Sequence, residues 1–141
     1  MGTVSAVTAW DNAFLTLGGR LRPIYGSQVS FDRRSEEYVV TLSEGTIVRI
    51  ACPAHATRGS AVRASCVVLN KSGLPNTLME FALRENARLR LARLCVDGDA
   101  LTVDYALPFA AACGSFLEEA VAAVAAAARE LRAELDIVSE T

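Results

Sequence analysis

The sequence predicts a single α+β domain, residues 1–141, with helices packed on an antiparallel sheet in the order α-β-β-β-α-β-β-α. Apolar residues spaced three and four apart predict helices at both ends of the chain and in its middle. Between them, β-branched runs broken by short turns predict strands. No linker, repeat or low-complexity segment divides the 141 residues, a length suited to one domain.

The first helix is expected over residues 4 to 17. Its apolar stripe consists of Val7, Trp10, Phe14 and Leu17. The adjacent Gly18 and Gly19 are expected to end the helix, because glycine is the usual residue after a last helical turn. A connection with Pro23 and Gly26 follows.

The stretch after this connection predicts an antiparallel meander. Val29 and Phe31 alternate with polar neighbours, "DRRSEE" predicts a turn, and "YVVTL" resumes the alternation. "SEG" is a second turn, leading into "TIVRIAC". The loop "PAHATRGS" precedes the last run of the meander, "AVRASCVVL".

The second helix and a hairpin occupy the next part of the chain. The apolar side of the helix is formed by Leu74, Leu78, Phe81 and Leu83, and Pro75 fits its first turn. From Leu89 the pattern "LRLARLCV" changes to the alternation of a strand, with Ala92, Leu94 and Val96 in one phase. Asp97-Gly98-Asp99 predicts a tight turn, because Asp-Gly accepts positive φ angles. The returning strand alternates Leu101, Val103, Tyr105 and Leu107, and Pro108 ends it.

A long amphipathic helix closes the chain. Ser115, with Glu118 three residues later, matches a capping box and predicts where this helix begins. Apolar residues then recur at three and four to about residue 137, with many alanines that permit close packing.

Composition limits the classes of partner and the compartment. A formal net charge of −2 gives no general attraction to nucleic acid or to an anionic membrane. No apolar stretch approaches the roughly 18 residues of a membrane span. The N-terminus lacks a positively charged region before an apolar run, so no secretory signal is expected and the cytoplasm is the predicted location.

The residues that could carry chemistry form no catalytic or metal-binding motif. The four cysteines are Cys52, Cys66, Cys95 and Cys113. No two of them are two or three residues apart, as the paired ligands of a metal site usually are. His55 is the only histidine, and its pairing with a cysteine lacks a third catalytic member. Asp97, Asp99 and Asp104 miss the spacing of a calcium loop, which favours the hairpin interpretation. We therefore expect no enzyme activity, no cofactor and no metal.

The segment "LMEFALRENARLRLARLCVDGDALTVDYALPF" and the helix after it resemble the C-terminal half of class I type III secretion chaperones. They also resemble the YbjN-like proteins, structural relatives of these chaperones. The shared pattern is a helix ending near an Asn, a strand, an acidic-Gly turn, a strand ending at Leu-Pro, and a closing helix. Here these features are Asn86, residues 91–96, Asp97-Gly98, residues 101–107, Pro108 and residues 115–137. The first half of the chain matches by element order alone.

The resemblance implies a homodimer that binds an unfolded segment of a secreted effector or other client protein. Such proteins offer apolar grooves and open sheet edges to an extended chain. The candidate partner-binding residues, each of which also suits an ordinary core, are Leu15, Phe31, Val40, Val48 and Ile50. The dimer seam is expected within residues 78 to 96, with Leu91 and Cys95 as contacts.

Two other functions remain open. The chain is only mildly acidic, whereas secretion chaperones tend to be markedly so. This favours a YbjN-like regulatory or stress-associated domain that acts through protein contacts. A remote alternative is a small enzyme that uses His55 or a cysteine.

Overall fold

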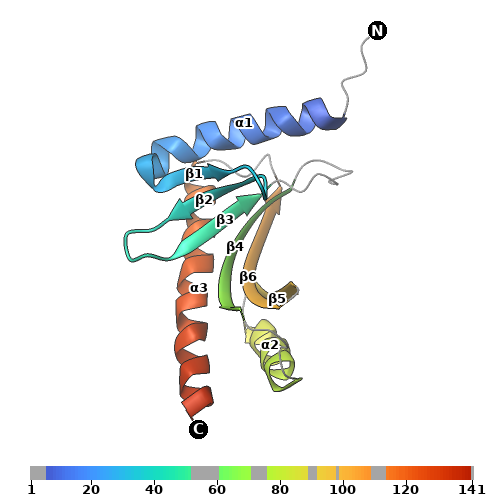
Figure 1. Cartoon of the computed structure of the whole chain (residues 1–141), viewed down its shortest axis with the longest axis vertical. Helices are drawn as coiled ribbons and strands as arrows, with labels where there is room; N and C mark the ends of the chain where they lie inside the picture. The colour runs from blue at the N-terminus through green and yellow to red at the C-terminus, as the bar shows by residue number, and fades with distance from the viewer. Residues whose placement is uncertain are drawn as a thin grey trace.

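The computed structural model describes residues 6–51, 61–70, 76–88, 92–97, 99–108 and 114–140 (Figure 1). Three α-helices, one 3-10 turn and six strands lie within these ranges. In chain order they are α1 (Ala6–Tyr25), η1 (Gly26–Gln28), β1 (Val29–Asp32), β2 (Glu37–Thr41), β3 (Ile47–Ala51), β4 (Ala61–Asn70), α2 (Asn76–Arg88), β5 (Arg93–Asp97), β6 (Ala100–Pro108) and α3 (Gly114–Glu140). His55, Cys52, Cys113 and Leu91 lie outside the described residues.

The strands form one six-stranded sheet in the order β1-β2-β3-β4-β6-β5, and every neighbouring pair is antiparallel. The predicted α+β class and its succession of helix, meander, helix, hairpin and helix are confirmed. The meander contains four strands, because the turn at residues 33–36 separates a short β1 from β2. Glu36 in this turn has a φ of 56°, in the left-handed region.

The second half of the chain follows its sequence pattern closely. Asp97 pairs with Ala100, so only two residues connect β5 to β6, as the Asp-Gly turn predicts. The last helix begins at Gly114, directly before Ser115, and continues to Glu140. The described part of β5 begins at Arg93.

One face of the sheet holds the core, and α3 covers its middle by packing on β3, β4 and β6. The fully buried strand residues include Val40, Val48, Ile50, Val62, Ala64 and Val103. A helix about 10–12 Å across spans only two or three strands that lie about 4.8 Å apart. The two ends of the sheet are therefore left to α1, which contacts β1, and to α2, which contacts β5 (Figure 1).

The first helix does not end at Gly18 and Gly19, as the sequence pattern predicts, but continues to Tyr25 with Pro23 in its last turn. Leu17 and Leu21 are both fully buried, and this burial favours the continued helix. A Cβ atom at Gly18 would collide with the hydroxyl end of the Tyr38 ring. The glycine thus lets α1 approach β2 closely and does not act as a stop signal.

The α2 helix is joined to β5 by one side chain. The Asn86 amide group donates a hydrogen bond to the Leu94 carbonyl oxygen at 3.0 Å, and its oxygen accepts one from the Leu94 N–H at 2.6 Å. Since β5 is an edge strand, the outward N–H and C=O groups of Leu94 have no neighbouring strand to pair with, and the Asn86 side chain takes that place. This gives a physical reason for an asparagine near the end of the helix.

We expect Gly18→Ala to lower the free energy of unfolding by about 1–3 kcal/mol, because the new methyl group overlaps Tyr38. Gly19→Ala is the matched control, since its Cβ would meet no atom within 4 Å. It should raise stability by about 0.5–1 kcal/mol, through helix propensity. Urea denaturation of both variants measures the two changes, and equal effects would contradict the Gly18–Tyr38 contact.

Asn86→Ala should cost about 1–3 kcal/mol, because it leaves two part-buried backbone groups of Leu94 without their partner. Asn86→Asp should give an intermediate loss, since a carboxylate accepts from the N–H but cannot donate to the carbonyl. Arg84→Ala, at an exposed position of the same helix, serves as the control. A loss no larger than that of the control would show that the two hydrogen bonds do not stabilise the α2–β5 contact.

Candidate functional site

The sheet face opposite the core carries charged side chains that are paired with one another. Arg49 on β3 lies 3.2 Å from Asp32 and 3.6 Å from Glu37. The Arg49 hydrogen bond, followed by that of the Arg34 backbone N–H, lowers the pKa of Asp32. Because Arg49 is shared between two carboxylates, this cluster is typical of a structural ion-pair network.

A second cluster joins β4 to β6 on the same face. The Ser65 hydroxyl donates to Asp104 at 2.7 Å, and Arg63 lies 3.5 Å from the other carboxylate oxygen. Within the described part of the chain, no buried side-chain nitrogen or oxygen lacks a hydrogen-bond partner. The described residues also contain no group of three metal-ligand side chains. These polar residues therefore pair with one another across neighbouring strands.

The two described cysteines are free thiols with raised pKa values. Burial is the main cause for Cys66 and for Cys95. The Arg132 guanidinium, 3.9 Å from the Cys66 sulfur, opposes this effect only in part. A raised pKa keeps a thiol protonated at neutral pH, so both are poor nucleophiles.

The five predicted partner-binding residues divide into two groups. Val40, Val48 and Ile50 are fully buried in the core, so the prediction that they line an open groove is wrong for this chain. They lie on β2 and β3 and face the helices that cover the sheet. Leu15 and Phe31, by contrast, are exposed by 71% and 44%.

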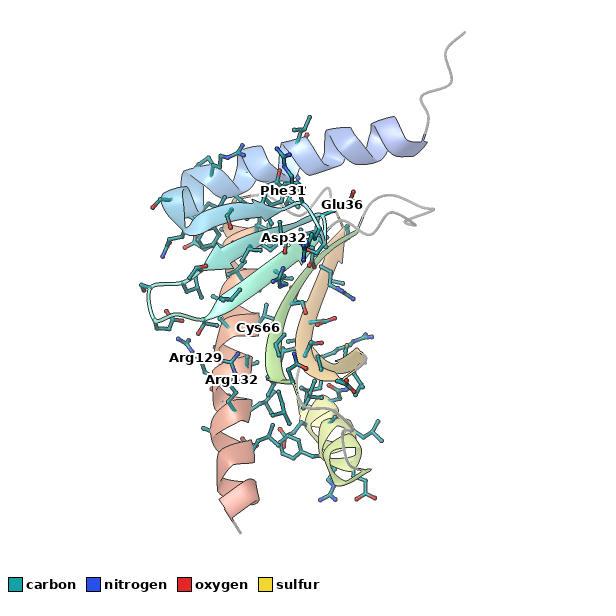
Figure 2. The ribbon with its side chains drawn as sticks, in the orientation of Figure 1. Phe31, Asp32, Glu36, Cys66, Arg129 and Arg132 are labelled. Carbon is teal, nitrogen blue, oxygen red and sulfur yellow. The ribbon has the colours of Figure 1, made fainter. Side chains whose placement is uncertain are left out.

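Leu15 on α1 and Phe31 on β1 are exposed apolar side chains of two elements that contact each other, and they are here called the α1–β1 surface. Figure 2 shows Phe31 beside α1, on a strand whose outer edge has no neighbour in the sheet. The Phe31 ring packs on Tyr38, with centroids 5.2 Å apart. Tyr38 in turn meets α1 at Gly18. Tyr38 thus connects β1 to α1, and the side chains of Leu15 and Phe31 remain exposed to solvent.

The opposite edge of the sheet carries a second exposed surface, formed by Leu83 of α2 and Val96 of β5 and called the α2–β5 surface. Their side chains are exposed by 73% and 43%. Cys95, a predicted dimer contact, is partly buried and alternates with the buried Leu94. Its predicted companion Leu91 lies outside the described residues. Both residues lie within the predicted dimer seam, residues 78 to 96, although neither was among its two predicted contacts.

Another exposed apolar residue, Phe116, lies in the first turn of α3. The helices α1 and α3 contact each other. Burial of the phenol raises the pKa of Tyr25 to about 12, and the charge of Glu118 on α3 adds to this effect. The phenol therefore remains neutral at physiological pH. Phe116 begins the apolar repeat of the last helix, and its side chain is exposed by 61%.

No described helix, including the 27-residue α3, has an apolar stretch that could span a membrane. All three helices instead pack against strands of the sheet.

Solved structures that share this fold include two from chaperone–partner complexes. One is a chain of the HopA1–SchA chaperone–effector complex, with a TM-score of 0.62 and 13% identity over 86% of this chain and 95% of that one. The other comes from the Yersinia pestis type III secretion chaperone SycH in complex with a stable fragment of YscM2. Its TM-score is 0.54, at 15% identity over 90% of this chain and 99% of that one. No family model and no curated protein matches the chain. The chain therefore has a fold found in structures of type III secretion chaperones.

Proposed function

We propose that the chain is a non-catalytic, cytoplasmic protein-binding module, and that it acts as a type III secretion chaperone for an unfolded segment of an effector. The observation that carries this proposal is the fold match to two chaperone–partner structures over nearly their whole length. The paired charges and protonated thiols described above support a binding role over a catalytic one.

The α1–β1 surface is the proposed client-binding site. An extended polypeptide has free backbone N–H and C=O groups, which an open strand edge can pair. β1 offers such an edge, and Leu15 and Phe31 offer apolar contact beside it. A client segment without a fold of its own loses no structure by binding there.

The α2–β5 surface is the proposed dimer interface. The sequence resemblance suggests Leu91 and Cys95 as contacts of this interface. The exposed side chains of Leu83 and Val96 are further candidate contacts. Exposed apolar side chains at a short edge strand are a liability in a monomer, and a second copy would cover them. A YbjN-like regulatory domain is the alternative, and it predicts no effector client.

The dimer should appear in light scattering as a mass twice the 15.0 kDa of one chain. Val96→Asp should convert it to a monomer, because an unpaired carboxylate inside the interface costs several kcal/mol. The same carboxylate remains solvated in the single chain, so the monomer should stay folded. Ala133→Asp, at an exposed position of α3, is the control and should remain dimeric. A wild-type mass near 15.0 kDa at micromolar concentration would count against the dimer.

Client binding should require the α1–β1 surface. The client to test is any effector-like product of the neighbouring reading frame, co-expressed with an affinity tag. Leu15→Asp and Phe31→Asp should each abolish co-purification while circular dichroism shows a folded chain. Phe31→Asp should also lower stability, because it loses the packing on Tyr38.

Val48→Asp is the contrasting variant, and it should unfold the chain because Val48 is fully buried. Ala133→Asp should retain the client. Retention of the client by both surface variants would remove α1–β1 as its site, and failure of the wild-type chain to retain any such client would refute the chaperone function.

A further inference from the structure

The sheet opens between β3 and β4. Their pairing covers only residues 49–51 and 63–65, whereas β4 continues to Asn70, paired with β6. Figure 1 shows the two strands spreading apart toward the β2–β3 turn. Beyond Ser65, β4 thus pairs with β6 alone among the strands of the described residues. This open side lies in the middle of the sheet, far from β1 and β5 in the strand order.

A pocket of about 280 Å³ occupies this opening, here called the β3–β4 notch. Its lining consists of residues 45–46, Ile47, Arg49, Ser65, Val67 and Arg132. Ile47 and Val67 are exposed apolar side chains, one from each strand. The notch therefore combines apolar walls with an interrupted strand ladder, and two arginines line it.

Arg132 is the cation in the notch that has no anionic partner among the described residues. Its Nη2 donates to the Val67 carbonyl oxygen and approaches the Cys66 sulfur. By contrast, Arg129, one turn earlier on α3 (Figure 2), pairs with Glu44 at 2.7 Å. Arg49 pairs with Asp32 and Glu37. A guanidinium has five N–H donors. Arg132 therefore has donors left for a carboxylate.

We propose that the β3–β4 notch binds an extended acidic peptide segment, with a carboxylate on Arg132 and an apolar side chain between Ile47 and Val67. Charge-assisted hydrogen bonds from a guanidinium to a carboxylate are among the stronger protein contacts. An extended segment also matches the unpaired side of β4. The assignment of this segment to the client rests on the proposed function, and it adds a second recognition point, separate from the α1–β1 surface.

The test uses the full chain, labelled with ¹⁵N, and the capped peptide acetyl-Thr-Val-Asp-Val-Thr-amide. Its addition should shift the amide resonances of Ile47, Ser65 and Val67, with saturable binding. The matched peptide with Asn in place of Asp should bind about tenfold more weakly, because it lacks the charge. Absence of shifts at these residues, or equal binding of both peptides, would overturn the proposal.

Arg132→Gln should weaken binding of the Asp peptide about tenfold, while its amide group can still donate to the Val67 carbonyl and keep the fold. Arg132→Lys retains the charge and should recover part of the affinity. Arg84→Gln removes the same charge from exposed α2 and should bind as the wild type does. Undiminished binding by Arg132→Gln would remove Arg132 from the site.

The peptide titration requires no client, so its outcome is separate from that of the chaperone proposal. Peptide binding at the notch without capture of the co-expressed client would support this inference and refute the proposed function. Capture of the client, with no peptide shift at the notch, would refute this inference alone.

Discussion

The packing of α3 on the middle of the sheet is the contact on which the remaining structure depends. Its buried face contains Ala120, Ala125 and Ala128 together with larger apolar residues, so the helix axis can lie close to β4 and β6. The strand residues beneath it are also small, with Ala64 and Cys66 among them. Close approach of this kind buries apolar area without long side chains, and it fixes the helix over the sheet centre.

One helix cannot cover six strands, and this limit determines where the molecule remains open. The ends of the sheet are covered by α1 and α2, each attached through a specific contact. Gly18 lets α1 approach Tyr38, and Asn86 joins α2 to the backbone of Leu94. Even so, Phe31 on β1 and Val96 on β5 remain partly exposed on the same sheet face as the core. The fold therefore leaves apolar side chains exposed at both edges of the sheet.

The sequence predicts the elements well because local patterns determine them. The Asp-Gly turn, the start of α3 beside Ser115 and the alternation in β6 each depend on neighbouring residues. The end of α1 is different. In the sequence Gly18 looks like the end of a helix, but in the structure it is a glycine because a side chain there would collide with Tyr38. The signal that could have corrected it is Leu21, which continues the apolar stripe of Leu17 beyond the glycines.

The candidate site illustrates a second limit of sequence patterns. Phe31, Tyr38, Ile50 and Ala64 lie in one row across β1 to β4 and share a sheet face. Their exposure falls from 44% at Phe31 to zero at Ile50, because the row runs from the sheet edge to its centre. Alternation along a strand indicates which residues share a sheet face. It does not indicate how far the strand lies from the edge of the sheet, and so how deeply those residues are buried. Val40, Val48 and Ile50 were therefore predicted as groove residues together with Phe31, although they belong to the core.

Hydrogen–deuterium exchange of the chain, alone and with its co-expressed client, tests the central claim most directly. An extended client that pairs with the sheet edge should slow exchange of the β1 amides, residues 29–32, and leave the buried part of α3 unchanged. Unchanged exchange at β1 in a complex that demonstrably contains the client would contradict the account.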